Sequence, residues 1–217
     1  MGSKNPRLAR KYDLFIFDWD GTLNSLRLYL MLNERAKKAL GLWNAESTLK
    51  DFKSMGAALK RKTERKEERK NSATSVLTDM FLSFSKPKLH KNSIEMLQQL
   101  RKRGKRLAIF SNARARRLTG ELSYVGIMDY FDLVVSARAI HAMKPSPAGI
   151  RAISHALGVK RGSTLYVGDA VEDMLTAQAA GVAACAVADG FDSYRKLKST
   201  KPDYIFTSIG DLTRALW

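Results

Sequence analysis

Two aspartates one residue apart are the first candidates for chemistry in this sequence. Asp18 and Asp20 follow the apolar run Leu14–Phe17, and Gly21 and Thr22 come next. Paired carboxylates can supply a nucleophile, a general acid or base, or oxygen ligands for a hard cation. The ordinary alternative is a hairpin turn, because Asp-Gly is a common turn dipeptide. Three further segments favour chemistry over the turn.

Polar residues at two later places could complete such a site. Ser111 and Asn112 follow the apolar run 107–110, and a hydroxyl and an amide there can bind an oxyanion. A helix N-cap is the alternative for this pair. Lys144, restrained by Pro145, offers a fixed positive charge that can neutralise a phosphate and a neighbouring carboxylate. Its alternative is a surface lysine in a loop.

A third segment repeats the pattern of an apolar run followed by acids. Asp169 and Asp173 follow the run 164–167 and are four residues apart, so both could face one site and hold a hard cation. An N-cap is the alternative for Asp169, and Glu172, out of this register, is expected to face solvent. The four segments together combine a carboxylate nucleophile, oxyanion donors, a cation and metal-binding acids, which is the mixture that phosphoryl transfer needs.

The elements that must position these residues alternate along the chain. Strands are expected at 12–17, 107–110, 133–135, 164–167, 183–187 and 204–206. Helices are expected at 93–103, 114–124, 147–157, 171–180 and 209–216. This alternation predicts an α/β fold, a Rossmann-like parallel sheet with helices on both faces. Ligands of such sheets bind at the carboxyl ends of the strands, where the polar groups are expected to meet.

Two stretches fall outside this alternation. Residues 1–11 are polar and basic and are expected to be a loose end. Residues 25–86 carry helical periodicity without a strand pattern, which predicts an all-helical insert after the first strand. The predicted domains are therefore a core of 1–24 and 87–217 and a helical insert at 25–86.

Composition places the chain among globular proteins. It has 217 residues, of which 45% are hydrophobic and 9% aromatic. The single cysteine excludes an internal disulfide, and no signal peptide or membrane-spanning run is visible, so a cytoplasmic location and no membrane partner are expected. The net charge of +17 is interpreted first as a solvated surface, with a nucleic acid, an anionic membrane surface or an anionic substrate as alternatives.

The other reactive side chains receive no role in this interpretation. Cys185 lies in a small apolar run and is expected to be buried filler. The histidines at 90, 141 and 155 show no convincing partners. Three arginines, at 114, 116 and 117, follow Asn112, and an exposed helix face is the ordinary interpretation of each. The alternative is that one of them reaches an anionic leaving group.

In order and spacing the four segments resemble the motifs of the haloacid dehalogenase-like hydrolase superfamily. The matching residues are Asp18-Trp19-Asp20-Gly21-Thr22, Ser111-Asn112, Lys144-Pro145, and Gly168-Asp169 with Asp173. The resemblance covers about 12–190. The surroundings Lys144-Pro145-Ser146-Pro147 and 177–181 are most similar to the phosphoglycolate phosphatase-like branch. The insert at 25–86 stands where this superfamily places a helical cap.

The resemblance implies a role for each motif residue. Asp18 would be the nucleophile that forms an aspartyl-phosphate, and Asp20 the general acid and then the base. An acid at position 20 disfavours dehalogenation. The phosphate-binding set would be Thr22, which would also help to hold Asp20, with Ser111, Asn112 and Lys144. The Mg²⁺ ligands would be Asp18, the carbonyl of Asp20 and Asp169, with Asp173 nearby or bonding through water.

The resulting hypothesis is a cytoplasmic, Mg²⁺-dependent phosphatase for a small phosphorylated metabolite, with phosphoglycolate as the best single substrate. One alternative is a nucleotide or nucleic-acid-end phosphatase that uses the positive charge. A phosphosugar mutase and a non-catalytic binding protein on the same fold are the others. The protein is expected to be a monomer or a homodimer.

Overall fold

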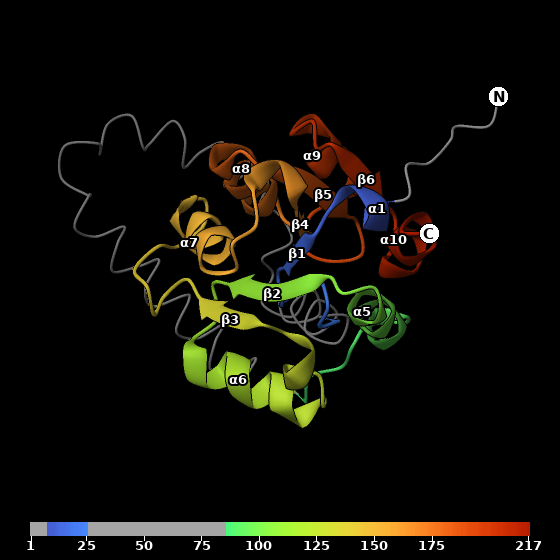
Figure 1. The fold of residues 1–217 in the computed structure, drawn as a ribbon. Coiled ribbons are helices and arrows are strands. Elements are labelled where there is room, and N and C mark those ends of the chain that lie inside the picture. The colour runs from blue at the N-terminus through green and yellow to red at the C-terminus, as the bar shows by residue number, and fades with distance from the viewer. Residues whose placement is uncertain (1–7, 26–85) are drawn as a thin grey trace, which may run out of the picture. The chain divides into compact units, whose positions relative to one another are not determined.

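The computed structural model describes residues 8–25 and 86–217, and these form a parallel sheet covered by helices (Figure 1). The sheet has six strands in the order β3-β2-β1-β4-β5-β6, and every neighbouring pair is parallel. The strands are β1 Leu14–Phe17, β2 Arg106–Ser111, β3 Leu133–Ser136, β4 Thr164–Gly168, β5 Ala183–Val187 and β6 Tyr204–Phe206. The predicted Rossmann-like fold class is confirmed.

The central position of β1 in the sheet explains why its sequence is wholly apolar. All four of its residues are buried, because helices cover both faces of the sheet. Leu14 pairs with Arg106 of β2 on one side and with Thr164 of β4 on the other. This common register aligns the carboxyl ends of three neighbouring strands, so the loops that follow them emerge side by side.

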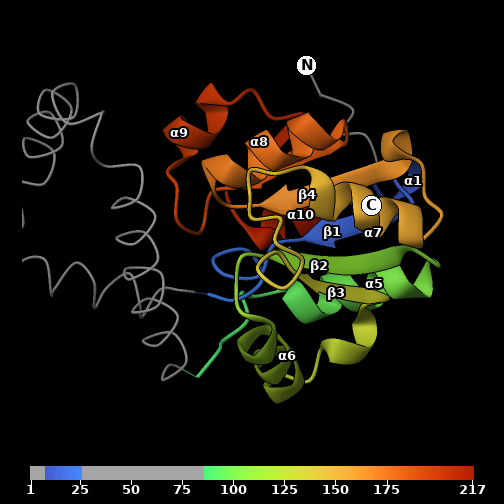
Figure 2. The same cartoon turned by 90° about the vertical axis from the view of Figure 1, so that its left-hand side faces the viewer.

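Two hydrophobic clusters fill the space between the sheet and its helices. Phe15 and Phe17 belong to one cluster and Leu14 and Ile16 to the other, as the alternation of side chains along a strand requires. The first cluster contains residues of α1 Leu8–Lys11, α5 Ser93–Lys102, α6 Ala115–Tyr124 and α10 Ile209–Ala215. The second contains residues of α7 Ala148–Ala156, α8 Val171–Ala180 and α9 Tyr194–Ser199. Figure 2 shows α7 and α8 on the face of the sheet opposite α5 and α6.

Two helices differ from the sequence-based expectation. Residues 8–11 were expected to belong to a loose end, but they form α1, because Leu8 and Ala9 are buried in the first cluster. Helix α9 was not predicted; its one buried residue, Leu197, joins the second cluster. Short 3-10 helices complete the connections at Met128–Tyr130 and Arg161–Ser163.

The predicted helical insert lies almost wholly outside the described residues. Backbone contacts divide the chain into one unit of 1–26 with 87–217 and a second unit of 27–86. The helices expected within 25–86 therefore stay a prediction. Among the helices of the described ranges, none is both long and apolar enough to cross a membrane.

Substitution of two helical glycines tests the packing between α7 and β2. Gly149 of α7 lies against the Phe110 ring, so an added methyl group would overlap the ring, whereas Gly120 of α6 faces open space. We expect Gly149→Ala to lower the free energy of unfolding by roughly 1–3 kcal/mol through overpacking. We expect Gly120→Ala to raise it by about 0.5–1 kcal/mol through helix propensity. Urea unfolding of both variants measures these effects, and stabilisation by Gly149→Ala would contradict the packing.

Candidate functional site

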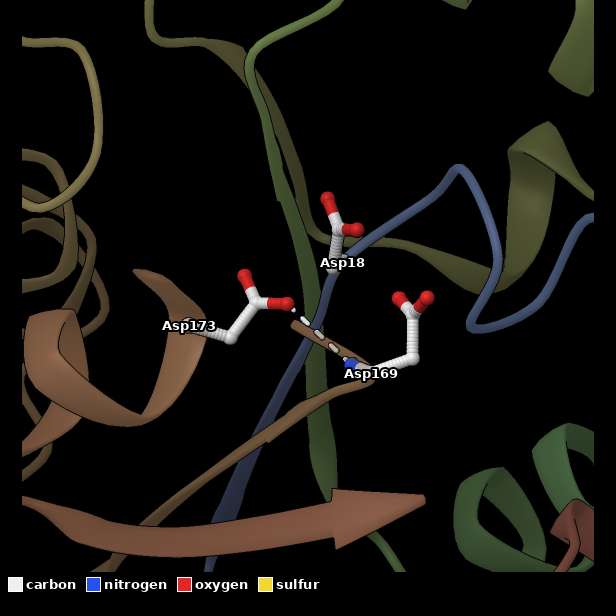
Figure 3. A group of neighbouring side chains, drawn as sticks. All are labelled: Asp18, Asp169 and Asp173. Atoms are coloured by element: carbon white, nitrogen blue, oxygen red, sulfur yellow. Dashed lines mark hydrogen bonds between the residues drawn. The ribbon is translucent and has the colours of Figure 1, made fainter. Parts of the chain in front are cut away.

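The predicted site residues converge at the carboxyl end of the sheet. Asp18 follows β1, Asp169 follows β4, and Asp173 lies in the first turn of α8. Figure 3 shows these three aspartates as neighbours. All three are buried, and each offers an oxygen within 4.8 Å of the oxygens offered by the other two. The fold thus gathers three acids in a space that water barely reaches.

Lys144 places a positive charge inside this acidic cluster. Its ammonium nitrogen Nζ donates to Asp18 Oδ1 at 2.6 Å and to Asp173 Oδ1 at 2.6 Å. Only 4% of the lysine side chain is exposed. Burial by itself lowers the pKa of Lys144, but the two carboxylates outweigh burial and raise the pKa above its ordinary value. The lysine is therefore a permanent cation between two acids.

Asp173 uses both carboxylate oxygens to organise its surroundings. Oδ1 accepts from Lys144 and lies 3.0 Å from the hydroxyl of Tyr166. Oδ2 accepts from the backbone N–H of Asp169 at 3.1 Å and of Ala170 at 3.0 Å. Asp173 thus stabilises the start of α8 and fixes the loop that carries Asp169. Sequence reasoning missed Tyr166, because an aromatic residue inside an apolar strand signals core packing.

Asp169 is held from two sides by hydrogen bonds. Its Oδ1 accepts from the Thr22 hydroxyl at 2.7 Å, and its Oδ2 accepts from the Phe191 backbone N–H at 2.7 Å. A methyl group on Gly21 or Gly190 would overlap this carboxylate. Gly21 also has a φ of 87°, which favours glycine. Thr22, expected to help hold Asp20, thus has its hydroxyl on Asp169 in this structure.

Ser111 and Asn112 lie at the end of β2, ahead of α6. The N-cap residue of α6 is Arg114, so the alternative interpretation of this pair as a helix cap is wrong. Asn112 Oδ1 accepts from the backbone N–H of Lys144 at 3.1 Å, which ties β2 to the lysine loop. Ser111 is buried, and its hydroxyl oxygen accepts from the Ala113 N–H at 3.2 Å. The Ser111 hydroxyl proton is thereby left available for another acceptor.

Asp20 turns toward α6. Arg117 donates to both of its carboxylate oxygens, with Nη1 3.1 Å from Oδ1 and Nη2 bound to Oδ2. Asn24 Nδ2 lies 3.3 Å from Oδ1. The arginines of α6 were interpreted as an exposed helix face, and this is wrong for Arg117, whose side chain is 6% exposed. Arg116 is exposed as expected.

Burial and mutual repulsion shape the ionisation of the acidic cluster. Burial raises the pKa of Asp18 to about 7, against the opposing effect of Lys144. Burial, followed by repulsion from Asp18 and Asp173, raises the pKa of Asp169 well above its ordinary value. When all three carboxylates are ionised they share one lysine, and the buried space then holds excess negative charge. A divalent cation with a preference for oxygen ligands would relieve this excess, and the donor set fits Mg²⁺.

Three other side chains named from the sequence lie as follows. Glu172 is exposed and Cys185 is buried, as expected. His90 was given no partner, but its Nδ1 lies 3.1 Å from Asp189 Oδ2. The sequence offers no signal for this pair, because the two residues are far apart along the chain.

Comparisons with known proteins show which proteins this chain resembles. A family model described as "Haloacid dehalogenase-like hydrolase" matches residues 15–187, most of the chain. A phosphoglycolate phosphatase from Vibrio vulnificus is 26% identical over 213 residues, covering 92% of this chain and 93% of that protein. A crystal structure of a haloacid dehalogenase-like hydrolase from Bacteroides fragilis matches with a TM-score of 0.71 and 24% identity. It covers 93% of this chain and 100% of that one, and it shows the fold alone.

Other relatives match over a shorter stretch. A phosphoglycolate phosphatase from Haemophilus influenzae is 28% identical over 129 residues, which are 59% of this chain and 58% of that protein. The chain thus spans less than two thirds of the length of this relative. This match does not establish a particular substrate for the chain.

The raised pKa of Asp18 predicts that the metal-free protein loses stability as the pH rises. Between the ordinary pKa of 3.8 and the folded value of about 7, the unfolded chain has released a proton that the folded protein still holds. The free energy of unfolding therefore falls across this window. Asp18→Asn cannot ionise, so from pH 5 to pH 8 it should gain stability over the wild type by roughly 2 kcal/mol.

Urea unfolding in EDTA at the two pH values measures this difference. Asp129→Asn removes an exposed carboxylate and serves as the control, with the same stability difference from wild type at both pH values. A pH-independent effect of Asp18→Asn would contradict the raised pKa.

Proposed function

We propose, on the premise that this chain belongs to the haloacid dehalogenase-like hydrolase family, that it is a Mg²⁺-dependent phosphatase for a small phosphorylated metabolite. The observation that carries the proposal is the buried Lys144, bound at 2.6 Å to both Asp18 and Asp173, with Asp169 beside them. A nucleophilic carboxylate, a fixed cation and further acids in one buried place suit phosphoryl transfer.

In the proposed reaction, Asp18 attacks the phosphorus and forms an aspartyl-phosphate. Lys144 binds Oδ1 of Asp18, so we assign the attack to Oδ2. Asp20 gives a proton to the departing alcohol oxygen as the O–P bond breaks. It then takes a proton from the water that attacks the aspartyl-phosphate, which releases phosphate and restores the Asp18 carboxylate.

The phosphate would be held by the residues that surround Asp18. The Ser111 hydroxyl and the Asn112 backbone would bind phosphoryl oxygens, and Lys144 would neutralise their charge. Asn112 supports this arrangement through its side chain, which accepts from the lysine backbone. Thr22 joins this set by resemblance, and its bond to Asp169 supports a role in orienting that carboxylate.

Asp18, Asp169 and the backbone carbonyl of Asp20 would hold Mg²⁺, with Asp173 close by. When bound, the ion would neutralise charge on the phosphoryl oxygens and on the carboxylates. The hydrogen bonds that orient Asp169 support this assignment, because they fix a ligand before the cation arrives.

Phosphoglycolate is the substrate that we propose first. The relatives from Vibrio vulnificus and Haemophilus influenzae are named for it, at 26% and 28% identity. We further propose that residues 25–86 form a helical cap, which would exclude water and select the leaving group.

Phosphate release from a panel of monoesters tests the reaction. We expect release from at least one ester with Mg²⁺ and none with EDTA. Asp18→Asn should lower the rate at least about 10³-fold, because the nucleophile is lost. The panel should include phosphoglycolate, glycerol phosphate, a sugar phosphate, a nucleoside monophosphate and p-nitrophenyl phosphate.

Asp129→Asn is the matched control and should retain the wild-type rate. The absence of release from every ester by the wild-type protein would refute the phosphatase. An isomerised sugar phosphate with little free phosphate would instead indicate a mutase.

Thermal unfolding with and without Mg²⁺ tests the metal site. Saturating Mg²⁺, at about 100 times its dissociation constant, should stabilise the wild-type protein by about 2.7 kcal/mol, because only the folded chain assembles the site. Asp169→Asn should lose most of this gain. Glu172→Gln removes an exposed acid near the site and should keep it. Equal Mg²⁺ stabilisation of Asp169→Asn and wild type would contradict the assigned ligands.

A further inference from the structure

A series of polar contacts links α6 to the loop that carries the two motif aspartates. The indole nitrogen Nε1 of Trp19 donates to Glu121 Oε2 at 2.5 Å. Arg117 Nη1 lies 3.1 Å and 3.2 Å from the two oxygens of Glu121. The same guanidinium binds both oxygens of Asp20. Trp19 and Asp20, which are adjacent in the sequence, are thus connected through Glu121 and Arg117 of α6.

These contacts are shielded from water. Trp19 is fully buried, and the side chains of Arg117 and Glu121 are 6% and 10% exposed. Charges in such a place cost desolvation energy, and a buried ion pair is a poor device for stability alone. A planar guanidinium that binds a carboxylate through two nitrogens instead fixes the orientation of the carboxylate plane, which a flexible ammonium group cannot do. The arrangement therefore suits the orientation of a carboxyl group.

The two oxygens of Asp20 are used unequally. Oδ1 accepts from Arg117 Nη1 and from Asn24 Nδ2, which fills its two acceptor positions. Among the contacts recorded for the described residues, Oδ2 accepts from Arg117 Nη2 alone. Oδ2 is therefore the oxygen with room for a transferred proton.

We propose that Arg117 is a positioning residue that acts through Asp20, and that it is itself aligned by Glu121 and Trp19. This proposal rests on the phosphatase function proposed above, since the proton that Asp20 transfers belongs to that reaction. Arg117 fixes the orientation of the Asp20 carboxyl group by binding both of its oxygens, and Oδ2, which keeps an acceptor position, carries the proton. In the first step the proton on Oδ2 passes to the leaving oxygen as the O–P bond breaks. In the second, a water proton passes to Oδ2 as the water oxygen bonds to phosphorus.

Leaving groups that differ in their need for a proton separate this role from a structural one. An alkyl alkoxide needs the proton to depart, whereas p-nitrophenolate departs without it. We expect Arg117→Ala to lower kcat/KM for an alkyl phosphate such as glycerol phosphate by roughly 10- to 100-fold. For p-nitrophenyl phosphate the loss in kcat/KM should be less than about threefold, because the assisted step is no longer limiting.

Rapid mixing with p-nitrophenyl phosphate provides a second readout. The second step also needs Asp20, so Arg117→Ala should accumulate aspartyl-phosphate. It should release a burst of nitrophenolate equal to the enzyme concentration, followed by a slow steady rate. Arg117→Lys keeps the charge without the planar fork and should rescue the alkyl phosphate rate in part. Glu121→Gln should shift both readouts in the same direction but less.

Arg116→Ala is the matched control, because it removes the same charge from an exposed position one residue earlier on α6. It should behave as wild type in both measurements. Equal losses for the alkyl and aryl esters, without a burst, would overturn the proposal and leave Arg117 a structural residue. A rise in KM confined to esters with an anionic leaving group would also overturn it, in favour of direct substrate contact. Failure of the phosphatase function is distinguishable, because the wild-type protein would then release no phosphate at all.

Discussion

The buried ion pairing of Lys144 with Asp18 and Asp173 is the constraint on which the rest of the site depends. An ammonium group with 4% of its side chain exposed must be compensated where it lies, and two carboxylates at 2.6 Å do so. The compensation is unequal, because Asp169 brings a third buried acid to the same place. The site therefore has fewer positive charges than ionisable acids. A bound metal ion would supply the positive charge that Lys144 alone does not.

The parallel sheet is what allows so many charges to meet. β1 lies between β2 and β4 in one register, so the loops after these strands leave the sheet together. Close approach then requires small residues, and Gly21 and Gly190 make room for the Asp169 carboxylate. The two hydrophobic clusters contain no reactive residue of the site, but their packing fixes the positions of the strands. Orientation of the acids is thus a consequence of how the strands pack.

A second set of residues orients the acids through hydrogen bonds. Tyr166 lies beside Asp173, Thr22 and the Phe191 backbone hold Asp169, and Arg117 holds Asp20. Each of these groups forms a hydrogen bond with a carboxylate. Since a carboxylate can rotate about its side-chain bonds, such partners decide which oxygen faces a ligand. Arg117 belongs to this set and Arg116 does not, because Arg117 is buried against Asp20 whereas Arg116 is exposed.

The sequence by itself determined the strand pattern, the parallel α/β class and the set of polar residues at the strand ends. These features are local: an apolar run, its breaking residues and the acids that follow it are all read within a few positions. Only the tertiary structure decided which side chains bind one another. Arg117 and Asp20 are separated by 97 positions, and Lys144 and Asp18 by 126. Periodicity marks the face of a helix that packs inward, but it does not say what that face meets. Arg117 on α6 and Leu8 on α1 were therefore misjudged, since the burial of each depends on a segment far away in the chain.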